Sequence, residues 1–262
     1  MPRARGEIRA DFAAHGAHTR IDRLYETGGL RLRFPKARDF CEGVIVNTAG
    51  GVVGGDHARL SLAAGPGARV ALTTQSAEKI YRTDGPPAGI ETSLKLESGA
   101  TLDWLPQETI LFDRAALVRS LDVDMAADAR LVACESVVFG RLAMGETCVA
   151  GNFLDRWRVR RAGKLVFAED VRLDSPAALL ARPAVGAGAR ALATLLYVAP
   201  DAPARLEDCR AALTDAPCES GVSALDGFLV ARLVSSSPEN LRLAILSLFS
   251  HLLGRAAPRV WQ

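Results

Sequence analysis

The chain has 262 residues, 49% of them hydrophobic, so it can bury the core of one large domain or of two small ones. Its net charge is +2, and no lysine and arginine cluster is interleaved with aromatic residues, so we expect no nucleic-acid partner. No apolar run approaches membrane-spanning length, and the first seven residues lack the apolar core of a signal peptide. We therefore expect no membrane partner and a cytoplasmic location.

Residues 1–19 show little pattern, and we treat them as a separate N-terminal segment. His15 and His18 stand three residues apart in it and could share a metal ion, although two ligands alone make a weak site.

A glycine-rich loop occupies residues 47–56 and ends at Asp56. Such loops cradle phosphates when they open into a helix, but residues 57–63 alternate apolar and polar side chains, which is typical of a strand. The Gly-Lys-Ser or Gly-Lys-Thr of a nucleoside triphosphate loop is also absent from the sequence. The pattern favours a tight backbone crossing that places Asp56; a nucleotide-binding enzyme is the alternative.

Three similar units follow between residues 60 and 133. Each has two apolar arms with period-two alternation, joined by a short turn that carries an alanine, and these turn alanines are Ala68, Ala100 and Ala129. One such unit cannot bury its apolar face alone, so the near-constant spacing predicts strands that stack in layers.

Polar residues recur after each turn alanine. Seven residues on stand Gln75, Gln107 and Ser136, with Glu78, Glu108 and Glu135 close by. If the units stack, these side chains gather at one end of the body and could hold a hard or borderline cation loosely. Alternatively, they cap strand ends and pair with arginines such as Arg82, Arg114 and Arg141.

Residues 155–161 and 164–169 predict a β-hairpin around Ala162-Gly163. Beyond residue 174 we expect a short helix opened by a Ser175 cap, a helix at 203–213, strands at 222–225 and 228–234, and a helix at 238–253 capped by Ser237. The expected fold is therefore mainly β, with a stacked-strand, β-helix-like body at 20–174 and a smaller α+β C-terminal portion at 175–262.

Catalytic motifs are missing from the sequence. It has no Gly-x-Ser-x-Gly elbow and no His-Glu-x-x-His, and its five cysteines are dispersed without a Cys-x-x-Cys pair. We expect no catalytic residues and no permanently bound cofactor. A carbohydrate-active solenoid that uses a pair of carboxylates is the remaining alternative.

Five ordered strings in the sequence resemble the family of urease accessory protein UreD, also called UreH. They are residues 47–56, 73–82, 105–113, 135–146 and 155–158, and the Pro-Arg-Val-Trp at 258–261 is similar to that family's ending. The resemblance runs from about residue 20 to the C-terminus and leaves His15 and His18 unassigned.

The resemblance implies a non-catalytic urease maturation factor. Members of that family act with UreF and the GTPase UreG, bind apo-urease, and help to deliver nickel to it; their fold is mainly β. Nickel would be in transit here, since histidines and paired thiols are few and carboxylates bind the ion weakly enough to release it. Our hypothesis is that Asp56, Glu78, Glu108 and Glu135 line part of the nickel path.

Overall fold

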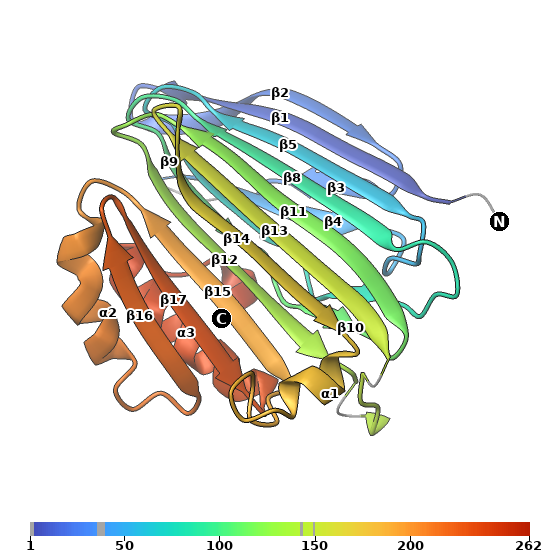
Figure 1. The fold of residues 1–262 in the computed structure, drawn as a ribbon. Coiled ribbons are helices and arrows are strands. Elements are labelled where there is room, and N and C mark those ends of the chain that lie inside the picture. The colour runs from blue at the N-terminus through green and yellow to red at the C-terminus, as the bar shows by residue number, and fades with distance from the viewer. Residues whose placement is uncertain (1–2, 36–39, 142–143, 149) are drawn as a thin grey trace.

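Two β-sheets stacked face to face form the body of the protein in a computed structural model that describes residues 3–35, 40–141, 144–148 and 150–262 (Figure 1). The seven-stranded sheet has the order β14-β13-β11-β8-β5-β1-β2, and the ten-stranded sheet has the order β16-β17-β15-β12-β9-β6-β4-β3, with β7 and β10 paired beside it. The strands are β1 (Arg5–His15), β2 (His18–Thr27), β3 (Leu30–Arg33), β4 (Cys41–Asn47), β5 (His57–Ala64), β6 (Arg69–Thr74), β7 (Glu78–Ile80), β8 (Ala88–Leu96), β9 (Thr101–Leu105), β10 (Thr109–Leu111), β11 (Ala115–Met125), β12 (Arg130–Phe139), β13 (Gly151–Arg161), β14 (Lys164–Asp174), β15 (Ala191–Val198), β16 (Glu219–Leu225) and β17 (Phe228–Ser235).

The chain alternates between the two sheets as it advances. Strands β5, β8, β11 and β13 lie side by side in parallel in one sheet, and β4, β6, β9 and β12 do the same in the other. Each predicted unit is therefore a corner whose two arms belong to different sheets, and the arms pair with the next coil rather than with each other. The expected stacked-strand, mainly β fold is confirmed.

The turn alanines explain the repeat. Ala68, Ala100 and Ala129 are at most 1% exposed, and they stack at the corners of successive coils. The N–H of Thr101 donates to the Ala68 carbonyl and the N–H of Arg130 donates to the Ala100 carbonyl, at 2.8 and 2.9 Å. A corner must turn the chain while its neighbours pack above and below it, so a small side chain is required there.

The N-terminal segment, which shows little pattern in the sequence, contains β1 and the start of β2. Ile8, Ala10 and Phe12 alternate towards the interior and are at most 2% exposed. Strand β1 extends the seven-stranded sheet parallel to β5, and its hairpin with β2 brings His15 opposite His18 at an exposed turn.

The C-terminal portion shares a sheet with the body. Strand β15 pairs antiparallel with β12, and β17 and β16 continue the same sheet. Strand β15 is buried on both faces and therefore lacks the alternation that identifies a half-exposed strand. The hairpin of β13 and β14 and that of β16 and β17 are confirmed.

Helices cover the outer face of the ten-stranded sheet (Figure 1). They are η2 (Ala202–Arg205), α2 (Leu206–Ala212), α3 (Pro238–Leu252) and η3 (Arg259–Trp261), whereas α1 (Pro176–Leu180) packs against β13 and β14 of the seven-stranded sheet. The Ser237 cap is confirmed, since its Oγ accepts from the Asn240 N–H at 3.2 Å. The Ser175 cap is wrong: Ser175 has φ 55° and its side chain makes no capping bond, because the left-handed backbone turns the residue away. Among the described residues no helix combines the length and apolarity needed to cross a bilayer.

Trp261 packs the C-terminal residues against the outer face of the ten-stranded sheet. Its ring is 2% exposed and packs edge-to-face on Phe249 at 5.0 Å, its Nε1 donates to the Leu105 carbonyl at 2.9 Å, and the Arg242 guanidinium lies 4.5 Å from the ring centroid. This one side chain therefore contacts both helix α3 and strand β9.

We expect Trp261→Ala to lower the free energy of unfolding by about 3–5 kcal/mol, because it leaves a cavity and an unpaired carbonyl. Urea denaturation checks this. Leu243→Ala is the matched control, since Leu243 lies on α3 but is 58% exposed, and a change within about 0.5 kcal/mol is expected. Equal effects of the two substitutions would contradict the assigned packing.

Candidate functional site

A polar layer interrupts the apolar interior between the two sheets. Arg119 on β11, Glu135 on β12 and Asp155 on β13 point inwards and are 4%, 4% and 7% exposed. On each strand the inward positions before and after are apolar, and they belong to two different hydrophobic clusters: Leu117, Val137 and Phe153 in one, Leu121, Ala133 and Trp157 in the other. The layer thus divides the interior into two apolar halves.

The Arg119 guanidinium holds this layer together. It contacts Asp155 through two parallel hydrogen bonds, Nε to Oδ1 at 3.1 Å and Nη2 to Oδ2 at 2.6 Å, and Nη1 contacts Glu135 Oε2 and donates to Thr109 Oγ1 at 3.2 Å. Two indole groups complete the set. Trp104 Nε1 donates to Glu135 Oε1 at 2.8 Å, and Trp157 Nε1 donates to Asp155 Oδ2 at 3.2 Å.

The electrostatics of the layer follow from its burial. Burial raises the pKa of Glu135, and the nearby Asp155 charge raises it further, while Arg119 and the Trp104 hydrogen bond oppose this. Burial by itself lowers the pKa of Arg119, but Asp155 and Glu135 outweigh it, so the guanidinium pKa is raised and the group stays charged.

A small cavity of about 60 Å³, partly open and lined mainly by apolar side chains from both sheets, adjoins the polar layer and is called the internal cavity below. Its polar lining comes from Thr74, Glu78, Thr92, Gln107, Thr109, Arg119 and Glu135. A second pocket of about 110 Å³, formed with Asn47 and the loop at residues 74–79, also includes Glu78. Glu78 therefore belongs to both spaces, and Asn47 Nδ2 donates to each of its carboxylate oxygens at 3.1 Å.

The cavity lies where the ten-stranded sheet is interrupted. Strand β9 pairs with β12 as far as Trp104 opposite Ala133, and β10 resumes the pairing at Thr109 opposite Val137. One coil earlier, β6 ends at Thr74 and β7 begins at Glu78, which pairs with Thr109. The recurring Gln75 and Gln107 fall within these matched interruptions, so polar side chains replace the regular ladder there.

Glu108 lies on the opposite side of this interruption from Glu78 and Glu135. It lines a pocket of about 100 Å³ against α3, together with Ser136, Glu239 and Arg242. Arg242 Nη1 donates to Gln107 Oε1 at 2.8 Å and stands 3.5 Å from Glu108 Oε2. Gln107 thus connects the internal cavity to the pocket beside α3, and its buried Nε2 has no hydrogen-bond partner among the described residues.

Asp56 lines none of these three spaces, and its two carboxylate oxygens hold the glycine loop in place. Oδ1 accepts from the Ala4 N–H at 2.8 Å and Oδ2 accepts from the Val53 N–H at 3.0 Å. Several other N–H groups of the loop are also used inside the protein, where those of Thr48, Val52 and Gly55 donate to carbonyls. Since the loop leads into strand β5 and several of its donors are engaged, it is poorly suited to cradle phosphate.

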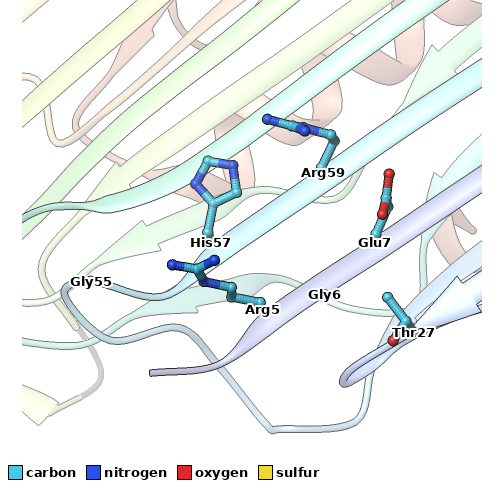
Figure 2. A pocket seen from close by; sticks show the side chains of 7 residues that line it. All are labelled: Arg5, Gly6, Glu7, Thr27, Gly55, His57 and Arg59. Atoms are coloured by element: carbon cyan, nitrogen blue, oxygen red, sulfur yellow. The ribbon is translucent and has the colours of Figure 1, made fainter. Parts of the chain in front are cut away.

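The glycines themselves have a structural explanation. Gly50 and Gly55 have φ of 75° and 84°, and a Cβ on Gly54 would stand 2.0 Å from Thr83 Oγ1. Gly55 lines an open hollow of about 510 Å³ on the seven-stranded sheet, and Figure 2 shows how the side chains of Arg5, Glu7, His57 and Arg59 lie around it. His57 and Arg59 both contact Glu91, so this hollow has an ordinary mixed-charge surface.

Metal-binding groups are sparse in the described ranges. No three His, Cys, Asp or Glu residues there are placed to hold a metal ion together. Burial also raises the pKa of the Cys209 thiol to about 11 and that of Cys148 to about 12, which disfavours the thiolate form that binds metals. The polar groups that line the cavity are carboxylates, an amide, threonine hydroxyls and the Arg119 guanidinium, without histidine or cysteine.

Sequence reasoning missed Arg119 and Asp155. The signal that could have identified them is a charged residue at an inward position of an alternating apolar strand, as in Leu117, Arg119 and Leu121. The arginines named as alternative partners pair elsewhere: Arg114 with Asp84 and Arg141 with Glu146.

Comparison with known proteins covers nearly the whole chain. The family model described as UreD urease accessory protein matches residues 4–262. The urease accessory protein UreD of Beijerinckia indica is 53% identical over 248 residues, which are 94% of this chain and 92% of that protein. That of Xanthobacter autotrophicus is 50% identical, covering 99% and 90%, and that of a Rhodopseudomonas palustris strain is 48% identical, covering 99% and 93%.

The burial of Glu78 leads to a pH-dependent prediction. Burial raises the pKa of Glu78 above its usual 4.5, against the opposing hydrogen bonds from Asn47 and the Lys79 backbone. The folded state then binds the Glu78 proton more tightly than the unfolded state does, so this group stabilises the fold at low pH and loses that contribution as the pH rises through its folded-state pKa.

We expect Glu78→Gln to raise the unfolding temperature at pH 7.5, with a difference that narrows as the pH falls towards 4.5. Thermal unfolding followed by circular dichroism at several pH values measures it. Glu97→Gln is the control, since Glu97 lies in a corner turn with 43% of its side chain exposed. A Glu78→Gln difference that is constant across this range would show that burial does not determine the behaviour of Glu78.

Proposed function

Because the chain belongs to the UreD urease accessory protein family, we propose that it is a non-catalytic urease maturation factor through which nickel passes to apo-urease. It acts in the cytoplasm, in a complex with UreF and the GTPase UreG. Nickel is cargo in this proposal, so the protein must attract the ion without retaining it.

The observation that supports this proposal most strongly is the position of Glu78. Its carboxylate lines both the pocket at residues 74–79 and the internal cavity that ends at Glu135. Glu78 and Glu135 bring two carboxylates to one small, mainly apolar space, and a low-dielectric surrounding strengthens the attraction of carboxylates for a divalent cation. Oxygen ligands without histidine or thiolate also bind nickel weakly enough for release.

Glu108 extends the proposed path towards α3. Gln107 and Glu108 are consecutive residues in the interruption between β9 and β10, and they line the internal cavity and the α3 pocket respectively. Asp56 takes a different part in the proposal. With both of its oxygens bound to backbone N–H groups, it positions the glycine loop beside Asn47, which in turn binds Glu78.

The two alternatives gain little support from the site. The glycine loop uses several of its N–H groups internally and leads into a strand, which disfavours a nucleotide-binding enzyme. The facing acids Glu135 and Asp155 share one guanidinium and are buried, whereas a glycosidase needs its two carboxylates in a cleft open to the substrate.

We expect Glu78→Gln and Glu135→Gln each to lower nickel incorporation into urease by about tenfold, by analogy with the loss of other metal-orienting groups. The measurement is the nickel content and activity of urease matured in cells that carry each variant. Glu97→Gln is the matched control and should leave both unchanged. Normal nickel content with both cavity variants would refute the proposed path.

The proposed partners require a separate experiment. The tagged full-length chain, co-expressed with UreF, UreG and the urease subunits, is expected to co-purify with them, and Glu78→Gln should do so equally well. Failure of the unaltered chain to retain either UreF or apo-urease would refute the proposed complex, whatever the nickel measurements show.

A further inference from the structure

The Arg119 guanidinium occupies the position of a cation inside a cage of oxygen atoms. Glu135 supplies Oε2, Asp155 supplies Oδ1 and Oδ2, and Thr109 supplies Oγ1. These groups come from strands of both sheets, and Thr109, Arg119 and Glu135 of the cage line the internal cavity. These oxygens contact three different nitrogens around the guanidinium, and carboxylate and hydroxyl oxygens are also the ligands that a hard divalent cation receives in proteins.

Every carboxylate oxygen in the cage already accepts a hydrogen bond. Glu135 Oε1 accepts from Trp104 and its Oε2 faces Arg119, while both oxygens of Asp155 accept from Arg119. Glu135 therefore contributes negative charge to the cavity but has no carboxylate oxygen left without a donor. A cation in the cavity is attracted by this charge and gains no full set of ligands from it.

The charge balance of the cage explains what would happen without the guanidinium. Two carboxylates against one guanidinium leave a single net negative charge, whereas the two carboxylates alone would carry the charge that a divalent cation neutralises. Buried charges without compensation are costly, so such a pair would bind a divalent cation or a proton in place of the missing guanidinium.

We propose that Arg119 is a positioning residue that keeps the Glu135 and Asp155 pair from becoming a nickel-retaining site, by holding its guanidinium where the ion would bind. This rests on the proposed function in one respect only, namely that nickel enters the cavity. With the guanidinium in place, the cavity attracts the ion through its net negative charge but does not bind it tightly.

The test is a gain of nickel binding by the full-length chain. Arg119→Gln removes the cation, and Arg119→His offers a neutral imidazole together with the two carboxylates, a donor set that suits Ni²⁺. The matched control is Arg119→Gln combined with Glu135→Gln and Asp155→Asn, which lacks the cage carboxylates. Equilibrium dialysis against Ni²⁺ alone, with metal analysis, measures retention, and circular dichroism verifies folding.

We expect both single variants to bind about one additional Ni²⁺ per chain, at least about tenfold more tightly than the unaltered chain and the triple variant. A purely structural role for Arg119 would lower stability without creating this binding. Folded single variants that bind no more Ni²⁺ than the triple variant would overturn the proposal.

If the single variants do not fold alone, the measurement becomes refolding from denaturant with and without Ni²⁺. Recovery of folded, nickel-containing protein supports the proposal, and failure of both variants to fold with Ni²⁺ overturns it, because a cation then cannot replace the guanidinium. Either negative result leaves the urease experiments on Glu78 and Glu135 unaffected. Normal urease nickel content with both Glu78→Gln and Glu135→Gln would instead refute the path, even if Arg119→Gln retained nickel.

Discussion

One buried guanidinium connects the two sheets of this protein. Arg119 and Asp155 are register neighbours on adjacent strands of the seven-stranded sheet, and Glu135 faces them from the ten-stranded sheet. The removal of these three charges from water is costly, and only the close hydrogen-bonded geometry offsets it. That geometry requires both sheets to hold their registers, so the polar layer specifies how the sheets stack, while the apolar clusters on either side contribute most of the burial.

The polar layer and the broken ladder beside it depend on each other. A continuous β9 would place further ladder pairs along β12 up to Val137, and side chains would fill the space now lined by Gln107 and Glu135. The interruption lacks the regular backbone hydrogen bonds of a ladder, and side chains replace part of them. For example, Thr74 Oγ1 accepts from the Gln107 N–H at 2.8 Å. The interruption is therefore built into the coil repeat, since it recurs at matching positions in two successive coils, between β6 and β7 and between β9 and β10.

Most of the fold is predictable from local pattern, because each corner repeats the same arrangement of apolar arms and a small residue. The members of the site are predictable only in part. Glu78, Glu108 and Glu135 stand out by their recurrence, but Glu108 points to the α3 side, since one residue of offset reverses the face of a strand. Arg119 and Asp155 do not belong to the recurring polar pattern. They are 36 residues apart in the sequence, so their contact depends on which strands become neighbours in the sheet. Strand β15 is missed for a related reason, since full burial removes alternation.

The corners and the interruptions differ in how well they tolerate a change in the number of residues. The turn alanines stack in register although they are separated by different numbers of residues, so the difference is absorbed at the opposite edge of the body, between β6 and β8 and between β9 and β11. Insertions and deletions can accumulate at that edge without disturbing the corners. The edge that borders the cavity can therefore change in length and chemistry while the stacked corners keep the same register.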